Sequence, residues 1–159
     1  MTAMAGKHPD SAGVVFPPPL IYLVGLILGY GLGFVFPATV VPFLLSLILG
    51  VVVLLVGLTI GLSAIRTFRK HSTTLVPTRS ATAMVQDGPY RFTRNPMYLS
   101  FGILYVGLSL MIDSPWSLLL LIPVILVVNY YVIVKEEKYL TRQFGDEYRS
   151  YMAKVRRWI

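Results

Sequence analysis

The segment Gly88-Pro89-Tyr90-Arg91-Phe92-Thr93-Arg94-Asn95-Pro96-Met97-Tyr98 joins a polar connection to an apolar run, and the rest of the chain is organised around it. The segment is rich in aromatic and basic residues, while the residues after it are almost entirely apolar as far as Ile112. Asn95 is a favoured N-cap residue, and Pro96 suits the first position of a helix. We therefore predict a helix that begins at Asn95-Pro96 and runs to about Ile112.

Three further apolar runs could each form a helix across a membrane. They extend from about Leu20 to Phe36, from Val40 to Ala64 and from Trp116 to Val134. About 17 to 25 mostly apolar residues are enough for a transmembrane helix. Only 13% of the 159 residues are charged, whereas soluble domains carry about 25%. The sequence thus predicts an all-α integral membrane protein with four transmembrane helices.

The distribution of Lys and Arg predicts the orientation of these helices. Apart from Lys7, every Lys and Arg lies between Arg66 and Arg94 or between Lys135 and Arg157. Because positively charged connections stay on the cytoplasmic side, we expect both termini and the long polar connection in the cytoplasm of a multi-pass protein of the cell membrane. The same distribution explains the net charge of +7 without a nucleic-acid partner. No signal-peptide pattern precedes the first helix, so we expect that helix to be retained.

We divide the chain into a disordered N-terminal tail (1–19), two transmembrane helices (20–64) and a catalytic region (65–159). Within the first helix, Gly25, Gly29 and Gly33 share a face that lets a neighbouring helix approach closely. Within the fourth, Pro123 should free the carbonyl of Leu119 and kink the helix.

The C-terminal tail after Glu136 reads as two helices separated at Gly145, with Asp146 as the cap of the second. Four residues then recur at helical spacing on one face, Tyr148, Tyr151, Met152 and Val155. We expect this cytoplasmic helical segment to cover the mouth of the last helical hairpin.

Several kinds of chemistry are excluded by the residues present. There is no cysteine, which rules out disulfides, thiolate nucleophiles and Cys-based metal sites. The two histidines, His8 and His71, are too far apart in sequence to suggest a metal site, and we predict no bound metal.

The two acidic residues Glu136 and Glu137 stand where the fourth helix leaves the membrane. At α-helical spacing Glu136 shares a face with Asn129, and Glu137 lies on the neighbouring face. One carboxylate can therefore point into the hairpin mouth and bind an amine or hydroxyl of a ligand, while the other faces water. A solvated helix end that pairs with Lys135 or Lys138 is the plainer alternative.

Together the two polar segments resemble the isoprenylcysteine carboxyl methyltransferase family, a group of integral membrane enzymes related to phospholipid N-methyltransferases. The first carries Gly88-Pro89-Tyr90-Arg91-x-x-Arg94-Asn95-Pro96-Met97-Tyr98. Two helices later comes Glu136-Glu137-x-x-Leu140-x-x-x-Phe144-Gly145-x-x-Tyr148-x-x-Tyr151-x-x-x-Val155. The resemblance covers residues 76–158. The chain departs from the family at Asn95, where His is frequent, and at Val155-Arg156-Arg157, where Val-Pro-Arg is usual.

The resemblance implies methyl transfer from S-adenosylmethionine to a lipophilic acceptor at the cytoplasmic membrane face, most like the carboxylate of a prenylated cysteine. The residues carried over as cofactor-binding are Tyr90, Asn95, Pro96, Tyr98, Glu136, Glu137, Leu140, Tyr148 and Tyr151. An anionic acceptor would need a cation, for which Arg94, Arg156 or Arg157 is available, and an amine acceptor would need Glu136 or Glu137 as a base. We accordingly predict Arg94, Glu137 and Arg156 as catalytic.

Other functions fit parts of the same pattern. A phospholipid or small-amine N-methyltransferase would use the same two segments. A transporter subunit or packing partner would have no nucleotide-like ligand and would tolerate changes at Tyr98 and Glu137. A membrane reductase with a nicotinamide cofactor ranks last, since no basic residues beyond the topological ones suggest a 2′-phosphate site. The expected partners are a lipophilic or lipidated substrate and membrane lipids.

Overall fold

The computed structural model describes residues 13–14, 16–70 and 84–159, and the regular elements of these residues are all helical. In chain order they are α1 (Pro18–Val35), α2 (Phe43–Lys70), the short 3₁₀ helix η1 (Gly88–Arg91), α3 (Pro96–Met111), α4 (Pro115–Val127), the π-helical turn η2 (Val128–Ile133), α5 (Val134–Phe144) and α6 (Asp146–Lys154). The four predicted apolar helices are therefore present, and the predicted all-α class is confirmed.

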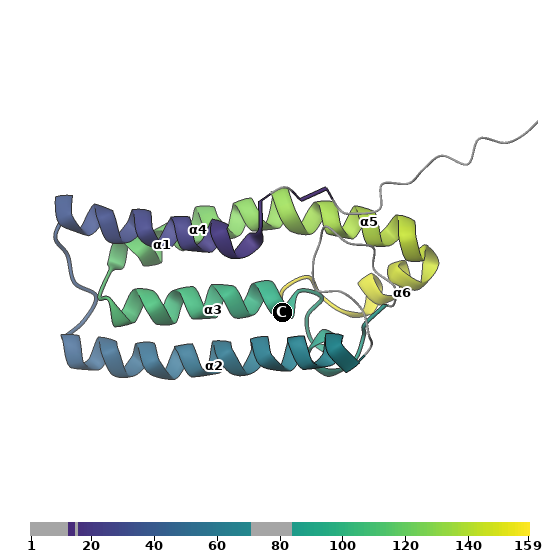
Figure 1. Ribbon diagram of the computed structural model, residues 1–159, viewed down its shortest axis with the longest axis horizontal. Helices are drawn as coiled ribbons and strands as arrows, with labels where there is room; N and C mark the ends of the chain where they lie inside the picture. The colour runs from purple at the N-terminus through teal and green to yellow at the C-terminus, as the bar shows by residue number, and fades with distance from the viewer. Residues whose placement is uncertain (1–12, 15, 71–83) are drawn as a thin grey trace, which may run out of the picture.

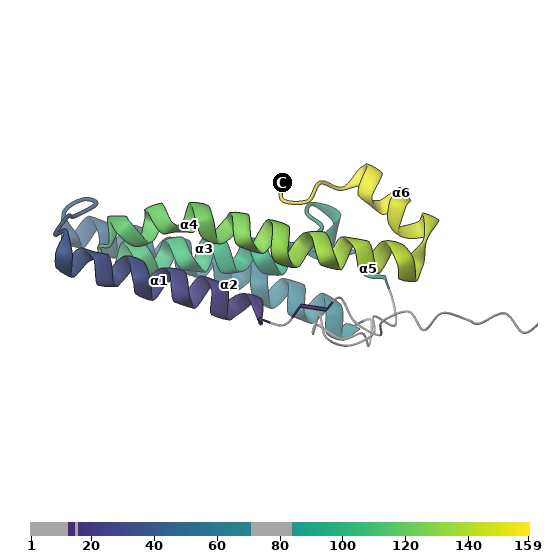
Figure 2. The ribbon, with the colours of Figure 1, turned by 90° about the horizontal axis from the view of Figure 1, so that it is seen from above.

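The long helices form a bundle in which α3 lies between α2 on one side and α1 with α4 on the other (Figure 1). α2 packs along α3, and α1 packs along α4. α4, η2 and α5 run on as one long helix, which extends beyond the beginning of α3 (Figures 1 and 2). Its far end carries α6, so the last residues of the chain return to the beginning of α3.

Three helices are long and apolar enough to cross a membrane: Pro18–Val35, Phe43–Lys70 and Pro115–Phe144. α3 is apolar but has only 16 residues, which corresponds to roughly 24 Å of helix. Large apolar side chains on the outside of the bundle are exposed, for example Leu44, Leu28 and Ile122. Exposed apolar surface of this extent is typical of helices that face lipid, and the protein is a multi-pass membrane protein.

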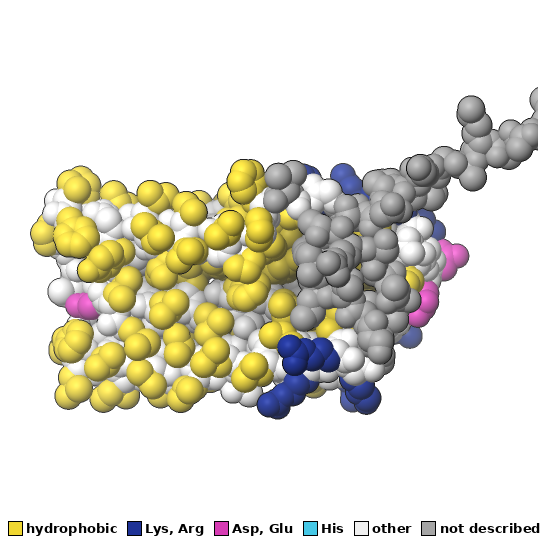
Figure 3. Space-filling model, viewed as in Figure 1, with side chains coloured by type: hydrophobic (Ala, Val, Ile, Leu, Met, Phe, Trp, Pro, Cys, Tyr) yellow, Lys and Arg dark blue, Asp and Glu magenta, His cyan; other side chains and the backbone are white. Residues whose placement is uncertain are grey.

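Charged side chains gather at one end of the bundle, which we call the polar end (Figure 3). It contains the last turn of α2, η1, the beginning of α3, α5 and α6. At the opposite end, Asp113 accepts a hydrogen bond from the backbone N–H of Val40 at 2.8 Å and joins the two short turns. The two conspicuous polar segments of the sequence thus lie at the same end, as predicted.

Several predicted boundaries require correction. The second helix begins at Phe43, because Pro42 ends the preceding turn, and it continues through the basic residues to Lys70 instead of ending at Ala64. The first helix begins at Pro18, inside the predicted disordered tail. Val14 of that tail is buried against the bundle. Residues 1–12 and 15 of the tail, and residues 71–83 of the polar connection, lie outside the described part of the chain.

The predicted glycine face of α1 is confirmed at two of its three positions. A Cβ on Gly25 would overlap the side chain of Val124, and one on Gly29 would overlap the backbone of Ser117. Both partners belong to α4, so these glycines let α1 and α4 approach closely. A Cβ on Gly33, by contrast, would meet nothing within 4 Å.

The break between α5 and α6 lies at Gly145, as predicted. This residue has φ +55° and ψ −125°, a backbone conformation that favours glycine. It is also the N-cap of α6, so the prediction of Asp146 as the cap was wrong. Asp146 is instead the first residue of the helix, and its carboxylate accepts a hydrogen bond from Arg149 at 2.8 Å.

Candidate functional site

The last five residues, 155–159, form a segment that we call the C-terminal strap, because it lies across the chain just before α3. The backbone N–H of Arg94 donates to the carbonyl of Arg156 at 2.9 Å. The carbonyl of Arg157 accepts from Thr93 Oγ1 at 3.0 Å and from Asn95 Nδ2 at 2.9 Å. Asn95 stands at the N-cap of α3 but makes no side-chain cap hydrogen bond; its amide is used to hold the strap.

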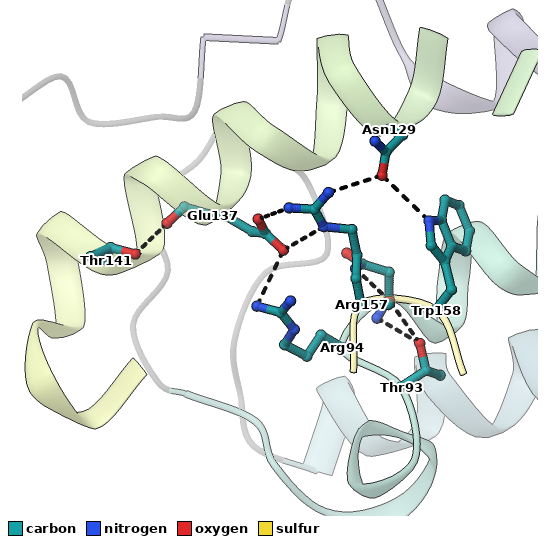
Figure 4. Close-up of polar contacts among 8 residues, drawn as sticks. Thr93, Arg94, Asn129, Glu137, Thr141, Arg157 and Trp158 are labelled. Carbon is teal, nitrogen blue, oxygen red and sulfur yellow. Dashed lines mark hydrogen bonds and ion pairs between the residues drawn. The ribbon is translucent and has the colours of Figure 1, made fainter. Parts of the chain in front are cut away.

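Glu137 is the centre of an ion cluster beneath the strap (Figure 4). Arg157 donates from Nε to Oε1 of Glu137 at 2.9 Å and from Nη2 to Oε2 at 2.6 Å. Arg94 Nη1 lies 3.2 Å from Oε1 of the same carboxylate. The side chains of Glu137 and Arg94 are only 13% and 11% exposed. The predicted alternatives, a water-facing Glu137 or its pairing with a neighbouring lysine, are therefore wrong.

Arg94 is incompletely bonded within this cluster. It is close enough to Glu137 for an ion pair, yet its buried Nε and Nη1 have no hydrogen-bond acceptor among the described residues. Two guanidinium groups face a single carboxylate, so the cluster carries an excess positive charge. Buried donors of this kind are costly unless they are paired. Nη1 lies beside Glu137, so Nε is the donor that could bind an anionic ligand.

Glu136 belongs to a second, separate arrangement. Its Oε1 accepts a hydrogen bond from the hydroxyl of Tyr98 at 2.6 Å, and the backbone carbonyl of Tyr98 accepts from the hydroxyl of Tyr22 at 3.0 Å. A carboxylate can accept about four hydrogen bonds, and Tyr98 is the one partner of Glu136 among the described residues. Glu137 is engaged by two arginines, whereas Glu136 accepts one hydrogen bond and retains more capacity to bind a ligand.

The π-helical turn η2 explains why the two glutamates take different directions. An α-helix would align Asn129 with Glu136, seven residues later, as the sequence predicted. A π-helical turn contains about one more residue than an α-helical turn, so Asn129 aligns with Glu137 instead. The contacts agree, because Arg157 binds Glu137 and also donates from Nη1 to Asn129 Oδ1 at 3.2 Å. Trp158 Nε1 lies 3.4 Å from the same oxygen.

The predicted tyrosines are buried around the polar end. The hydroxyl of Tyr151 donates to the carbonyl of Tyr90 at 2.7 Å and joins α6 to η1. Burial, together with the nearby Glu137, raises the pKa of Tyr148 to about 12, and Arg94 opposes this shift. Hydrogen bonding to Glu137 raises the pKa of Arg157. Tyr148 therefore stays protonated at neutral pH, and Arg157 stays charged.

The remaining predicted residues have mainly structural positions. Pro96 is fully buried, and Leu140 is half-buried on α5. The side chain of Arg156 is exposed, and only its carbonyl reaches the site. The second guanidinium beside Glu137 is that of Arg157, so the structure does not bring the side chain of Arg156 to this cluster. Its catalytic role stays a prediction.

Sequence reasoning missed Asn129, Thr93 and Trp158 as members of this site. Asn129 could have been noticed as a carboxamide inside an apolar run. Thr93 and Trp158 carried no such signal, because the three hydrogen bonds from residues 93–95 to the strap end on its backbone carbonyls.

Comparisons with known proteins place this site in a family. The sequence profile described as phospholipid methyltransferase matches residues 45–147, more than half of the chain. The chain belongs to the phospholipid methyltransferase family. The match includes α2, α3, the long helix and both glutamates, and it ends within α6.

Individual relatives agree with this membership. A protein-S-isoprenylcysteine O-methyltransferase of Saccharomyces cerevisiae is 31% identical over 113 residues, or 70% of this chain and 47% of the yeast protein. One from Schizosaccharomyces pombe is 36% identical over 72 residues, or 45% of this chain and 30% of that protein. An uncharacterized protein of Haemophilus influenzae is 44% identical over 63 residues, 40% of this chain and 100% of that protein.

The chain thus matches less than half the length of either yeast enzyme. No solved structure matches it. The predicted resemblance to the isoprenylcysteine carboxyl methyltransferase family is confirmed by these matches.

Proposed function

We propose that this protein transfers a methyl group from S-adenosylmethionine to the carboxylate of a lipophilic acceptor at the polar end of the bundle. The observation that carries the proposal is the buried Arg94, whose Nε has no hydrogen-bond acceptor among the described residues. It lies next to a glutamate pair in a chain of the phospholipid methyltransferase family. The Lys and Arg residues gathered at this end support a cytoplasmic location for it and for both termini of the chain, since positively charged connections stay on that side.

The donor set at the polar end fits this cofactor. S-adenosylmethionine carries a sulfonium, an ammonium group and ribose hydroxyls, which a carboxylate can bind, and a carboxylate of its own. Glu136 and Tyr98 would hold the cationic or hydroxyl groups, because Glu136 retains free acceptor capacity beside its bond from Tyr98. The other predicted cofactor residues at this end would supply the walls of the pocket.

The chemistry needs few groups from the protein. When bound, the cofactor supplies a methyl group on a sulfonium. The sulfur leaves as a neutral thioether, so the transfer requires no covalent enzyme intermediate. With a carboxylate acceptor, a C–O bond forms as the C–S bond breaks, and no proton moves. Arg94 would hold the acceptor carboxylate, and the strap would exclude water. Alignment and a dry site can supply much of the acceleration.

The apolar part of the acceptor would enter from the bilayer between the helices. This is supported by the position of Arg94, which lies at the beginning of α3, where the apolar bundle meets the polar end. A single acceptor can then have its carboxylate among charged residues and its hydrocarbon chain among apolar ones.

An amine acceptor is the second candidate, and it is favoured by the phospholipid methyltransferase profile. A protonated amine must lose its proton before methylation, for which Glu136 would serve as a base. Arg94 could bind the phosphate of the phospholipid in that reaction, so its donors do not separate the two acceptors. We rank the carboxylate first because both yeast relatives are named protein-S-isoprenylcysteine O-methyltransferase.

The test uses purified protein in detergent, S-adenosylmethionine with a tritiated methyl group, and two acceptors: N-acetyl-S-farnesylcysteine and phosphatidylethanolamine. A carboxylate product is a methyl ester, which releases volatile tritiated methanol in base, whereas an N-methyl product does not.

We expect base-labile label with the farnesylated acid. We also expect its loss in Arg94→Gln and its retention in Arg149→Gln, an exposed arginine on α6. Tritium that is found on the phospholipid and is stable to base would establish the amine reaction. Absence of tritium from both acceptors would contradict the proposed activity.

A further inference from the structure

Asn129 is the one carboxamide or charged side chain within the apolar stretches of the four long helices, 18–35, 43–65, 96–111 and 115–134. Polar side chains are costly at such positions and usually have a function. Asn129 also lies in the π-helical turn, an irregularity that is frequent at functional sites. Two independent features therefore single out this residue.

The orientation of the Asn129 amide follows from its partners. Arg157 Nη1 and Trp158 Nε1 both face the same atom, at 3.2 and 3.4 Å. Both groups are donors only, so the atom between them must be the oxygen. Asn129 thus holds the side chains of two consecutive strap residues, as Figure 4 shows.

These two residues connect the strap to different parts of the molecule. Trp158 packs against the buried core formed by α1, α3 and the long helix. Arg157 binds both oxygens of Glu137. Without the oxygen of Asn129, Nη1 of Arg157 and the indole N–H of Trp158 would lose their acceptor. Arg157 would then be held by Glu137 alone, and Trp158 by its apolar contacts.

We propose that Asn129 is a positioning residue of the methyl-transfer site, which fixes Arg157 and Trp158 so that the strap stays closed over a bound cofactor. That a cofactor binds beneath the strap rests on the proposed function. That Asn129 fixes the strap through Arg157 and Trp158 does not depend on it. Asn129 acts through Arg157 and Trp158 and does not touch the reacting groups. Its loss therefore speeds the escape of ligand more than it unfolds the bundle.

The first test follows Trp158 in the ligand-free protein. Trp116→Phe leaves Trp158 as the single tryptophan of the chain. In this background Asn129→Leu removes the oxygen, and Asn129→Asp keeps an acceptor at the same distance. Thr59→Val is the control, since Thr59 is exposed on α2 and bonds only to Leu55 of its own helix. We expect red-shifted emission and stronger acrylamide quenching in Asn129→Leu, and parental behaviour in the other two.

The second test measures dissociation of S-adenosylhomocysteine from each protein. We expect dissociation about tenfold faster from Asn129→Leu, the size that the loss of one or two hydrogen bonds gives, and recovery in Asn129→Asp. Should Asn129→Leu fail to fold, Asn129→Ser, whose hydroxyl is too short to reach the strap, is measured in its place.

Emission and dissociation unchanged in the Leu or Ser variant would overturn the inference. A wild-type protein that binds no S-adenosylhomocysteine would remove the proposed function instead. The emission of Trp158 would then still decide whether Asn129 holds the strap.

Discussion

Arg157 binds Glu137 through both sides of the carboxylate, with Nε 2.9 Å from Oε1 and Nη2 2.6 Å from Oε2. This two-point contact joins the last residues of the chain to the end of its longest helix. Such paired hydrogen bonds between arginine and carboxylate are strong and fix geometry. Arg94 approaches the same carboxylate from the beginning of α3, so one glutamate connects three segments that are distant in sequence.

The ion cluster predicts an unequal cost for removing its members. Glu137→Ala leaves two guanidinium groups without a counter-charge, one of them 11% exposed, and should lower the stability by about 2–4 kcal/mol. Arg157→Ala leaves Glu137 paired with Arg94. The side chain of Arg157 is 32% exposed, so solvent screens its contribution, and we expect a loss of about 1 kcal/mol. Thermal unfolding in detergent measures both changes. An Arg157→Ala protein that unfolds at or below the temperature of Glu137→Ala would refute this ranking.

The close packing of α1 on α4 predicts different effects for two neighbouring glycines. Gly29→Ala places a methyl group into the backbone of Ser117, whereas Gly31→Ala meets nothing within 4 Å. We expect Gly29→Ala to cost about 1–3 kcal/mol, because the two helices must separate. Gly31→Ala should be neutral or slightly stabilising, since alanine favours a helix more than glycine does. Unfolding midpoints of the two variants test the packing, and equal midpoints would show that α1 is not seated on α4 as described.

The bond from Tyr98 to Glu136 predicts a role in ligand binding. Tyr98→Phe removes the hydroxyl at 2.6 Å that orients the carboxylate, and should weaken binding of S-adenosylhomocysteine about tenfold, as expected for loss of a hydrogen bond to a charged group. Tyr105→Phe is a matched control on the same helix, because its hydroxyl bonds to the backbone of Ser117, away from both glutamates. If both variants bound with equal affinity, Glu136 would not owe its position to Tyr98.

The amino-acid sequence predicted the helices well because long apolar runs have few alternatives in a membrane. It also predicted that the segments around Asn95 and Glu137 lie at one end, since two helices joined by a short turn must return there. The prediction failed at η2, where one extra residue in a helical turn rotates the side chains before it relative to those after it. The π-helical turn moves Asn129 from the side of Glu136 to that of Glu137, and spacing rules assume 3.6 residues in every turn.

The sequence also could not tell which of the consecutive residues Arg156 and Arg157 faces Glu137. The strap is extended, not helical, at Val155. In extended chain, adjacent side chains point in opposite directions, so only one of two consecutive arginines can face Glu137. Charge and composition are the same for both residues, and the choice depends on where the strap is fastened at Thr93 and Asn95.

Calorimetric titration of the purified protein with S-adenosylhomocysteine tests most directly whether the polar end binds the cofactor through Glu136. The wild type, Glu136→Ala and Glu147→Ala are compared, Glu147 being an exposed residue of α6. Our account predicts micromolar binding by the wild type and by Glu147→Ala, and loss of binding in a folded Glu136→Ala protein. A folded wild type that binds no S-adenosylhomocysteine, or a Glu136→Ala protein that binds as the wild type does, would contradict it.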